Sequence, residues 1–383
     1  MTKFEPNSVI IRLMNYNWQH RNWPNFKYEA DRFDAMASQF REISGQSTGV
    51  LLGLSEQAQE ESLITLLVVE LLKTSAIEGE MLSRVDLISS IKKNLGFTSS
   101  AVAVKDKRSE GIAELMVQSR RGFAEELSET TLFDWHNLLM RGSHGVEVGQ
   151  WRTHAEPMQI VSGAMGRETV HFEAPPSERV PAEMQKFIAW FNATGPKGAQ
   201  PLTNPILRSA VAHLYFESIH PFEDGNGRIG RFIAEKVLSQ NAGRPVLLSL
   251  SSVIEADKKK YYAALQKASQ SLEIDDWIVY FGDVVLQAQR AFVQTISFSI
   301  KKSHFFDQKK SLLNNRQQRV VSRMLAEGED EFTGGINARK YQAIAKVSKA
   351  TATRDLQDLV EKQILVSKGG GRSTNYQVNL EES

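Results

Sequence analysis

Cysteine is absent from the 383 residues of this sequence. Without a thiol the chain can form no disulfide, no cysteine nucleophile and no thiolate metal site. Long apolar runs are missing as well, because the most apolar stretch, 63–72, is half the ~20 residues that cross a bilayer and includes Glu70. The first fifteen residues carry Lys3, Glu5 and Arg12 instead of the apolar core of a signal peptide. We therefore expect no export, no membrane partner and a cytoplasmic location.

An excess of charge of either sign is also lacking, with 46 basic against 45 acidic residues. Binding of a polyanion by bulk electrostatics is thereby excluded, and any nucleic-acid contact must be local. Hydrophobic residues make up 41% and charged residues 24%, as in ordinary globular proteins. The length predicts two or three domains.

The apolar spacing is mostly helical, so the predicted fold class is mainly α. One exception is 158–172, where two short β-type runs flank a glycine-containing turn, Gly163 to Arg167, and predict a β-hairpin. Changes in composition and apolar spacing along the chain predict four parts. They are an N-terminal helical and aromatic lobe (1–53), a helical segment (54–100), a larger helical domain with the hairpin (101–298) and a small C-terminal domain (305–383).

The most informative stretch is 220–231, with the sequence HPFEDGNGRIGR, which lies between two helical segments. Gly225, Asn226 and Gly227 stand where the second helix begins, so backbone N–H groups and the positive end of the helix dipole can face an anion. Arg228 and Arg231 are three residues apart and share one helix face, where two guanidinium groups can meet a polyphosphate.

Two further groups in this stretch suit phosphate chemistry. Asp224 is a hard oxygen ligand, suited to a Mg²⁺ ion that bridges phosphate oxygens. Histidine ordinarily has a pKa near 6.5, so His220 is suited to accept a proton from an attacking hydroxyl. A base, a metal ligand, an anion nest and a cation pair therefore fall within twelve residues.

Residue for residue, this stretch resembles the signature His-Pro-Phe-x-[Asp/Glu]-Gly-Asn-Gly-Arg-x-x-Arg of the Fic (filamentation induced by cAMP) family. The resemblance implies a helical core with a β-hairpin flap, ATP as co-substrate with Mg²⁺, and transfer of AMP to a Ser, Thr or Tyr hydroxyl of a protein. It also implies that His220 is the base and Asp224 the metal ligand. The ATP-binding residues implied within the signature are Gly225, Asn226, Gly227, Arg228, Ile229, Gly230 and Arg231.

Outside the signature, the resemblance implies nucleotide contacts from Val170 and His171 on the flap. Tyr261, Tyr262 and Ser269 resemble the family segment that lines the adenine pocket. Adjacent residues on a helix face different ways, so at most one tyrosine stacks on the base and the other packs. Gly149 to Arg152 resembles the start of the flap, and we interpret His136 as structural.

A regulatory motif is suggested by Thr74, Glu78 and Gly79, which resemble the inhibitory pattern [Ser/Thr]-x-x-x-Glu-[Gly/Asn] of many Fic proteins. By that resemblance Glu78 pairs with Arg231 and displaces the γ-phosphate of ATP, because a carboxylate and a phosphate compete for one guanidinium. An ordinary glutamate at a helix end is the alternative. The same carboxylate could instead position water for removal of AMP.

The last 80 residues have the element order of a winged helix-turn-helix, with three helices followed by two short strands around Lys368 to Arg372. From 301 to 383 there are 15 Lys/Arg against 10 Asp/Glu. Lys349, Arg354 and Lys362 fall on the expected recognition helix, where phosphate contacts are made. DNA binding and protein docking or dimerisation both remain open, and we expect a homodimer.

Three functions remain. The first is a protein adenylyltransferase held off by Glu78, with ATP and an unidentified protein target as partners. The second is a DNA-binding transcriptional regulator whose Fic domain senses nucleotide or modifies itself. The third is an enzyme that transfers another phosphoryl-linked group.

Overall fold

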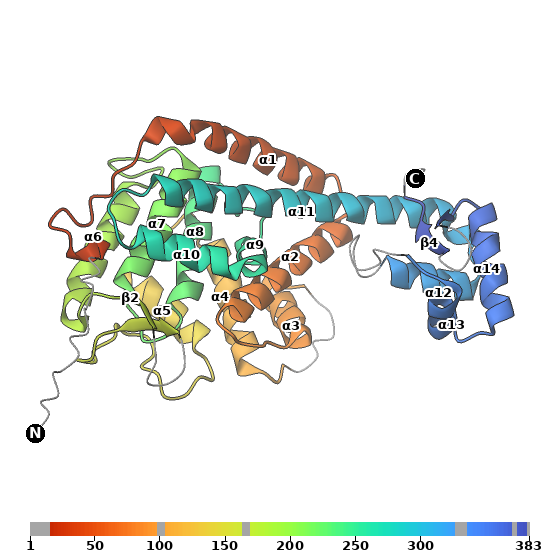
Figure 1. The fold of residues 1–383 in the computed structure, drawn as a ribbon, viewed down its shortest axis with the longest axis horizontal. Coiled ribbons are helices and arrows are strands. Elements are labelled where there is room, and N and C mark those ends of the chain that lie inside the picture. The colour runs from red at the N-terminus through yellow and green to blue at the C-terminus, as the bar shows by residue number, and fades with distance from the viewer. Residues whose placement is uncertain (1–15, 98–103, 163–168, 326–334, 370–373, 381–383) are drawn as a thin grey trace, which may run out of the picture. The chain divides into compact units, whose positions relative to one another are not determined.

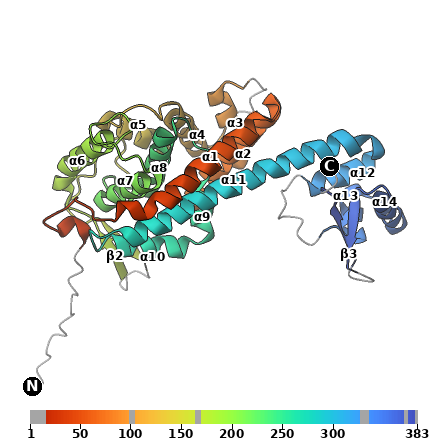
Figure 2. The same ribbon diagram turned by 90° about the horizontal axis from the view of Figure 1, so that it is seen from above.

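The computed structural model describes residues 16–97, 104–162, 169–325, 335–369 and 374–380. The described chain is mainly helical, with two separate two-stranded antiparallel sheets (Figures 1 and 2). It divides into two compact units, the first made of 1–46 and 63–290 and the second of 47–62 and 291–383. Each unit has its own apolar core.

The elements from the start of the chain to the longest helix are all helical apart from one hairpin. Their bounds are α1 (Asp34–Leu52), α2 (Glu56–Ile77), α3 (Arg84–Leu95), α4 (Lys107–Arg121), α5 (Glu129–Leu139), β1 (Gln159–Ser162), β2 (Thr169–Glu173), α6 (Val180–Ala193), α7 (Pro205–Ile219), α8 (Asn226–Ala242), α9 (Leu250–Ala256), α10 (Lys258–Ala268) and α11 (Asp275–Lys309). No helix in the described part of the chain combines the length and apolarity needed to cross a membrane.

Helices α7 and α8 pack against each other at the centre of the first unit (Figure 1). Every residue of α7 is buried, which explains its lack of a polar face. Its start is fixed by Asn204, whose side chain accepts a hydrogen bond from the Leu207 N–H at 3.1 Å, and by Pro205 in the first turn. Helix α8 ends at Gly243 in the left-handed conformation (φ 69°). The two helices therefore form a rigid support for the loop between them.

The predicted hairpin is present, with β1 and β2 paired antiparallel and a register shift between Ile160 and Val161. Its predicted turn, Gly163 to Arg167, lies outside the described residues. Residues of the N-terminal lobe pack on it: the Tyr16 and Phe172 rings meet edge to face with centroids 5.1 Å apart, and the indole N–H of Trp18 donates to the Glu173 carbonyl at 2.7 Å. The hairpin thus has one face against the lobe.

The second unit contains three short helices followed by a hairpin. Their bounds are α12 (Asn315–Met324), α13 (Ala338–Ala345), α14 (Lys349–Glu361), β3 (Leu365–Lys368) and β4 (Asn375–Val378). Ser348 begins α14 as predicted, because its side chain accepts from the Thr351 N–H. A buried cluster that includes Val320, Tyr341 and Leu356 forms the core of this unit.

Candidate active site

The signature loop connects α7 to α8 and places His220 at the end of α7. His220 adopts the left-handed conformation (φ 50°, ψ 60°), and its N–H still donates to the Phe216 carbonyl at 3.0 Å. A non-glycine residue rarely adopts this conformation, and such strain concentrates at functional sites. The backbone turns sharply at His220, which takes the chain out of the helix and into the loop.

Arg152 anchors that loop through hydrogen bonds to its backbone carbonyls. Its side chain is 1% exposed, and its Nε donates to the His220 carbonyl at 2.8 Å while its backbone N–H donates to the Pro221 carbonyl at 2.9 Å. Its Nη1 donates to Ser177 Oγ at 2.8 Å. Burial lowers the pKa of Arg152 to about 10, so the guanidinium stays charged at neutral pH. The sequence indicated Arg152 as part of the start of the flap, but not as a support for the signature loop.

The start of α8 has the geometry of an anion site. Gly225 is left-handed (φ 82°) and precedes the first turn, whose N–H groups have no partner within the helix. The side chain of Asn226 bridges the loop, because its Oδ1 accepts from the Phe222 N–H at 2.9 Å and its Nδ2 donates to the Phe222 carbonyl at 2.8 Å. For Asn226, the group left to meet a phosphate is the backbone amide.

Two residues predicted to bind ATP lie on the packing face of α8 instead. The side chain of Ile229 is fully buried in the apolar core. Gly230 faces α7, where a Cβ would overlap Glu217 Oε1 and approach the His213 ring at 3.1 Å. The signature spans more than one helical turn, so some of its positions must face the core, and only the backbone of these two residues is left to contact a nucleotide.

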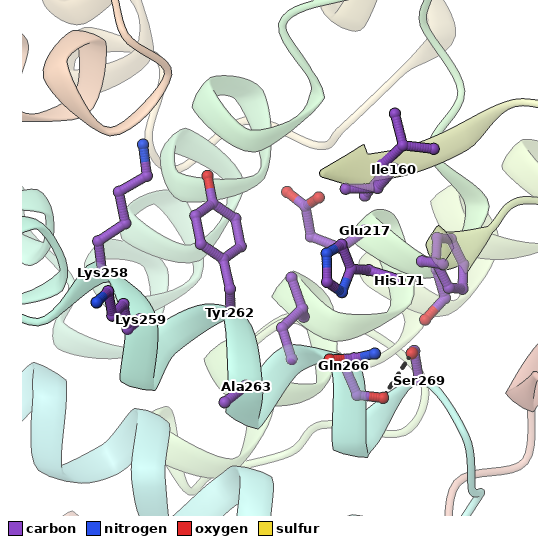
Figure 3. A pocket seen from close by; sticks show the side chains of 13 residues that line it. Ile160, His171, Glu217, Lys258, Lys259, Tyr262, Ala263, Gln266 and Ser269 are labelled. Atoms are coloured by element: carbon purple, nitrogen blue, oxygen red, sulfur yellow. Dashed lines mark hydrogen bonds between the residues drawn. The ribbon is translucent and has the colours of Figure 1, made fainter. Parts of the chain in front are cut away.

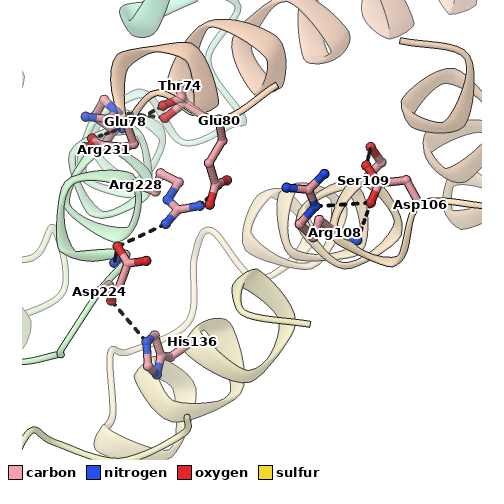
Figure 4. A network of polar contacts seen from close by, with 11 residues as sticks. Thr74, Glu78, Glu80, Asp106, Arg108, Ser109, His136, Asp224, Arg228 and Arg231 are labelled. Carbon is pink, nitrogen blue, oxygen red and sulfur yellow. Dashed lines mark hydrogen bonds and ion pairs between the residues drawn. The ribbon is translucent and has the colours of Figure 1, made fainter. Parts of the chain in front are cut away.

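Arg231 is buried and is bound by the segment that the sequence marks as inhibitory (Figure 4). Its Nη2 lies 2.8 Å from Glu78 Oε1, and its Nε donates to Thr74 Oγ1 at 2.7 Å. Burial alone lowers the pKa of Arg231, but Glu78 outweighs it and raises the pKa above its ordinary value. A Cβ on Gly227 would stand 2.5 Å from Glu78 Oε1, so the carboxylate lies directly on the first turn of α8.

The neighbouring arginine is bound in the same way, by a residue that the sequence did not indicate. Arg228 Nη1 lies 2.6 Å from Glu80 Oε2, and its Nη2 lies 3.3 Å from Asp224 Oδ1 (Figure 4). Gly79 (φ 81°) ends α2, and the Glu80 N–H donates back to the Ser75 carbonyl at 2.9 Å. This turn directs Glu80 toward α8. The signal in the sequence was a second acidic residue just after the helix stop.

Asp224 is the candidate metal ligand and is half exposed, at 52% of its side chain. Its Oδ1 accepts from the Gly225 N–H at 2.6 Å. The described residues contain no group of three or more His, Asp or Glu side chains that could enclose a metal ion. One accessible carboxylate fits a Mg²⁺ ion that takes its other ligands from phosphates and water.

His136 is structural, as predicted. Its ring is fully buried and stacks on Phe222 with centroids 4.0 Å apart. The Gly149 N–H donates to Nδ1 at 3.0 Å, so Nε2 carries the proton and donates to the Asp224 carbonyl at 3.2 Å. Burial is the main reason that the pKa of His136 falls to about 4.

A cleft of about 600 Å³ opens between the hairpin, the end of α7 and α10 (Figure 3). His171, Tyr262 and Ser269 line it, as the sequence suggests for nucleotide contacts, whereas Val170 is not among its lining residues. Tyr261 is buried, and its hydroxyl lies 2.8 Å from His213 Nε2. Of the two tyrosines, Tyr262 therefore faces the cleft and Tyr261 packs.

Three charged residues that sequence reasoning missed also line the cleft: Lys258, Lys259 and Glu217. Lys258 contacts the carbonyl of Ile77 at the end of α2, where the helix dipole favours a cation. Glu217 lies on the last turn of α7, three residues before His220. None of the three belongs to a motif, and their proximity to one was the only signal in the sequence.

Comparison with known families matches two segments of the chain. Residues 126–238 match the Fic/DOC family, and residues 16–97 match a domain of unknown function, DUF4172. The chain therefore contains a Fic domain, and the signature loop lies within it.

Curated relatives carry the name of an enzyme class. The chain is 27% identical over 146 residues to protein adenylyltransferase fic-1 of Caenorhabditis elegans, which is 38% of this chain and 25% of that protein. It is 30% identical over 99 residues to a probable protein adenylyltransferase of Aquifex aeolicus, which is 26% of this chain and 27% of that protein. The chain thus matches about a quarter of the length of these relatives.

Solved structures share the fold. A Fic family protein from Desulfovibrio desulfuricans superposes with a TM-score of 0.53 at 20% identity, covering 93% of this chain and 98% of that one. A Fic domain containing signaling protein from Bacteroides thetaiotaomicron gives a TM-score of 0.50 at 18% identity, covering 68% and 97%. The helical core with its hairpin is therefore a Fic-like fold.

Proposed function

We propose that this protein is a protein adenylyltransferase that transfers AMP from ATP to a Ser, Thr or Tyr hydroxyl of a protein. The observation that carries the proposal is the signature loop, which joins His220 directly to the N-terminus of α8 and its two buried arginines. The cleft beside this loop has the volume and the aromatic side chain, Tyr262, that an adenine nucleotide requires. The names of the curated relatives support the same reaction class.

In this reaction the oxygen of the target hydroxyl bonds to the α-phosphorus of ATP. The bond from that phosphorus to the bridging oxygen breaks, and pyrophosphate leaves with the electron pair. His220 accepts the proton of the hydroxyl as the new bond forms. The N–H groups at the start of α8 and the guanidinium of Arg228 hold the phosphates, so catalysis consists of positioning and charge stabilisation.

A magnesium ion would be held by Asp224, and when bound it would neutralise charge on the phosphate oxygens. The exposed carboxylate at the mouth of the anion nest supports this assignment. Within the protein, Asp224 is anchored by the Gly225 N–H and by Arg228.

We further propose that Glu78 inhibits the enzyme by holding the place of the γ-phosphate. Its carboxylate pairs with Arg231 and stands against Gly227, where a phosphate group would approach α8. Both Glu78 and Glu80 belong to the segment 16–97, so this domain of unknown function would be the regulatory part of the enzyme. The same carboxylate, facing a modified target, can position a water for removal of AMP.

The test uses ATP labelled separately at the α- and γ-phosphates, with Mg²⁺, and reads the label on protein. The proteins are wild type, Glu78→Gly, Glu78→Gln and Glu78→Gly/His220→Ala. We expect α-label on both single variants, little on wild type and none on the double variant. The glutamine variant is the matched control, because it removes the charge and retains the size.

Other outcomes would contradict parts of the proposal. γ-label without α-label would identify phosphate transfer instead of AMP transfer. Equal α-label on wild type and Glu78→Gly would show that Glu78 does not inhibit the enzyme. No label on any of the four proteins would favour a regulator that senses nucleotide.

A second candidate function is DNA binding by the C-terminal unit, which we propose to be a winged helix with α14 as its recognition helix. Lys349 and Arg354 on α14 and Lys368 on β3 are exposed, as phosphate contacts must be. Lys362 is instead paired with Asp358 at 2.7 Å, and Arg372 lies outside the described residues. Binding of labelled duplex DNA should weaken steeply with salt and weaken further in Lys349→Gln/Arg354→Gln. Equal binding by that variant would contradict it.

A further inference from the structure

One buried carboxylate in the active site has no part in the mechanism above. Glu217 is 6% exposed, lines the cleft beside Tyr262 and points into it in Figure 3. Its Oε1 has no hydrogen-bond partner among the described residues. An unpartnered buried carboxylate costs several kcal/mol in stability unless cations compensate, so its presence calls for a reason.

The compensating groups converge on it from two helices. His220 Nδ1 lies 3.6 Å from Glu217 Oε2. Burial alone raises the pKa of Glu217, but His220, His213 and Arg231 outweigh it and hold the pKa below its ordinary value, so the group is a carboxylate. The absence of a side chain at Gly230 provides the space, since a Cβ there would overlap Oε1. The pocket around this carboxylate is thus built from both helices that carry the signature.

The side of His220 that faces Glu217 is the Nδ1 side. Nδ1 is buried and has no hydrogen-bond partner among the described residues. A carboxylate next to one ring nitrogen keeps the proton on that nitrogen and leaves the lone pair on the other. With Nδ1 protonated toward Glu217, Nε2 is the free base. At 3.6 Å the two atoms lie just beyond hydrogen-bond distance, and catalytic hydrogen bonds are often long before substrate binds.

We propose that Glu217 is the positioning residue for His220, which selects the Nδ1–H tautomer and strengthens Nε2 as the base that accepts the proton of the target hydroxyl. This inference rests on the proposed function of His220. It does not assign to Glu217 a contact with the reacting atoms. The alternative is that Glu217 only stabilises Arg231. The two roles differ in whether a change at Glu217 alters the tautomer of the His220 ring.

The primary test observes the ring itself. ¹⁵N-labelled histidine in the full chain reports the tautomer of His220 by NMR, with His220→Ala used to assign the signals. We expect the Nδ1–H tautomer in the wild type. In Glu217→Gln we expect the Nε2–H tautomer to become populated, because an amide oxygen attracts the Nδ1 proton less than a carboxylate does. An unchanged tautomer would overturn the proposal, whatever happens to activity.

The other titratable groups around Glu217 are the same in the wild type and in Glu217→Gln. They are His213 on α7, Arg231 on α8, and Tyr261 and Tyr262 on α10. Glu183→Gln is the matched control, because Glu183 is a buried carboxylate on α6 that binds Trp23 and Arg179 instead. It should leave the His220 signals unchanged. Thermal unfolding of each variant verifies that it is folded.

The kinetic test uses the Glu78→Gly background. Glu217→Gln should lower kcat for AMP transfer roughly tenfold to a hundredfold, as removal of an orienting carboxylate does elsewhere, with the KM for ATP nearly unchanged. Glu217→Asp should recover part of the rate. A raised KM for ATP with an unchanged kcat would assign Glu217 to the support of Arg231. Failure of AMP transfer in the background protein itself would count against the proposed function, and the NMR measurement would still test the positioning.

Discussion

Glu80 Oε2 lies 2.6 Å from Arg228 Nη1, while Glu78, two residues earlier, lies 2.8 Å from Arg231 Nη2. One short segment therefore binds both signature arginines at once. Because Gly79 stands between the two carboxylates in a left-handed conformation, they reach successive turns of α8 from a single bend in the chain. Release of this bend would free both guanidinium groups together.

The Glu80 contact leads to the first prediction. In the Glu78→Gly background, Glu80→Gln should lower the KM for ATP about threefold to tenfold, because a partly exposed ion pair worth roughly 1 kcal/mol no longer competes for Arg228. With Glu78 intact, Glu80→Gln should leave transfer low. The control is Glu255→Gln, which removes a carboxylate paired with Lys73 of α2. A raised KM would show that Glu80 orients Arg228 for ATP.

The two adjacent tyrosines should separate binding from stability. Tyr262→Ala should raise the KM for ATP about tenfold, since an aromatic platform stacks a base with 1–3 kcal/mol. Tyr261→Phe should leave the KM unchanged and lower the free energy of unfolding by about 1 kcal/mol, because His213 Nε2 loses its buried partner. Nucleotide titration and urea unfolding of each variant measure the two effects. A raised KM in Tyr261→Phe with an unchanged KM in Tyr262→Ala would show that the adenine does not stack on Tyr262.

The N-terminal lobe should stiffen the hairpin. Trp18→Phe retains a ring and removes the N–H that donates to the Glu173 carbonyl. We expect amide hydrogen exchange in 169–174 to accelerate by about tenfold, while the amides of α8 stay protected. Trp190→Phe, on α6, is the matched control and should leave 169–174 unchanged. Equal exchange in all three proteins would mean that this contact contributes nothing to the hairpin.

His136 should make stability depend on pH. Its pKa is about 4 in the folded chain against 6.5 ordinarily, so between these values the unfolded chain binds a proton that the folded chain does not. The contribution of His136 to the free energy of unfolding is therefore constant above about pH 6.5. As the pH drops toward 4, that contribution falls by on the order of 3 kcal/mol in total. His136→Gln should show a shallower decrease in urea unfolding between pH 4.5 and 7. Identical slopes would contradict the shift.

Much of the fold could be predicted because its signals are local. The start of α8 at Asn226, the cap at Ser348 and the end of α2 before Gly79 each depend on backbone preferences of a few neighbouring residues. The same holds for the hairpin, whose alternating side chains and turn lie within fifteen residues. The resemblance to the Fic signature likewise concerned residues that are consecutive in the chain.

Within the site, the local sequence could not show which residues of the signature face the core of the protein. Ile229 and Gly230 belong to the signature as fully as Arg228 and Arg231 do, yet they face the core. A signature identifies a loop, whereas the rotation of the helix about its axis decides which of its side chains reach the nucleotide.

The sequence by itself determined the signature loop, the helix start that follows it, the candidate base and the carboxylate expected to oppose Arg231. Tertiary structure alone decided that Glu80 binds Arg228 and that Arg152 supports His220. These two contacts join residues 148 and 68 positions apart. Such pairs leave no periodicity or spacing in the chain. They are fixed by burial, because a charge removed from water is stable only where the packing of α2, α7 and α8 supplies its partner.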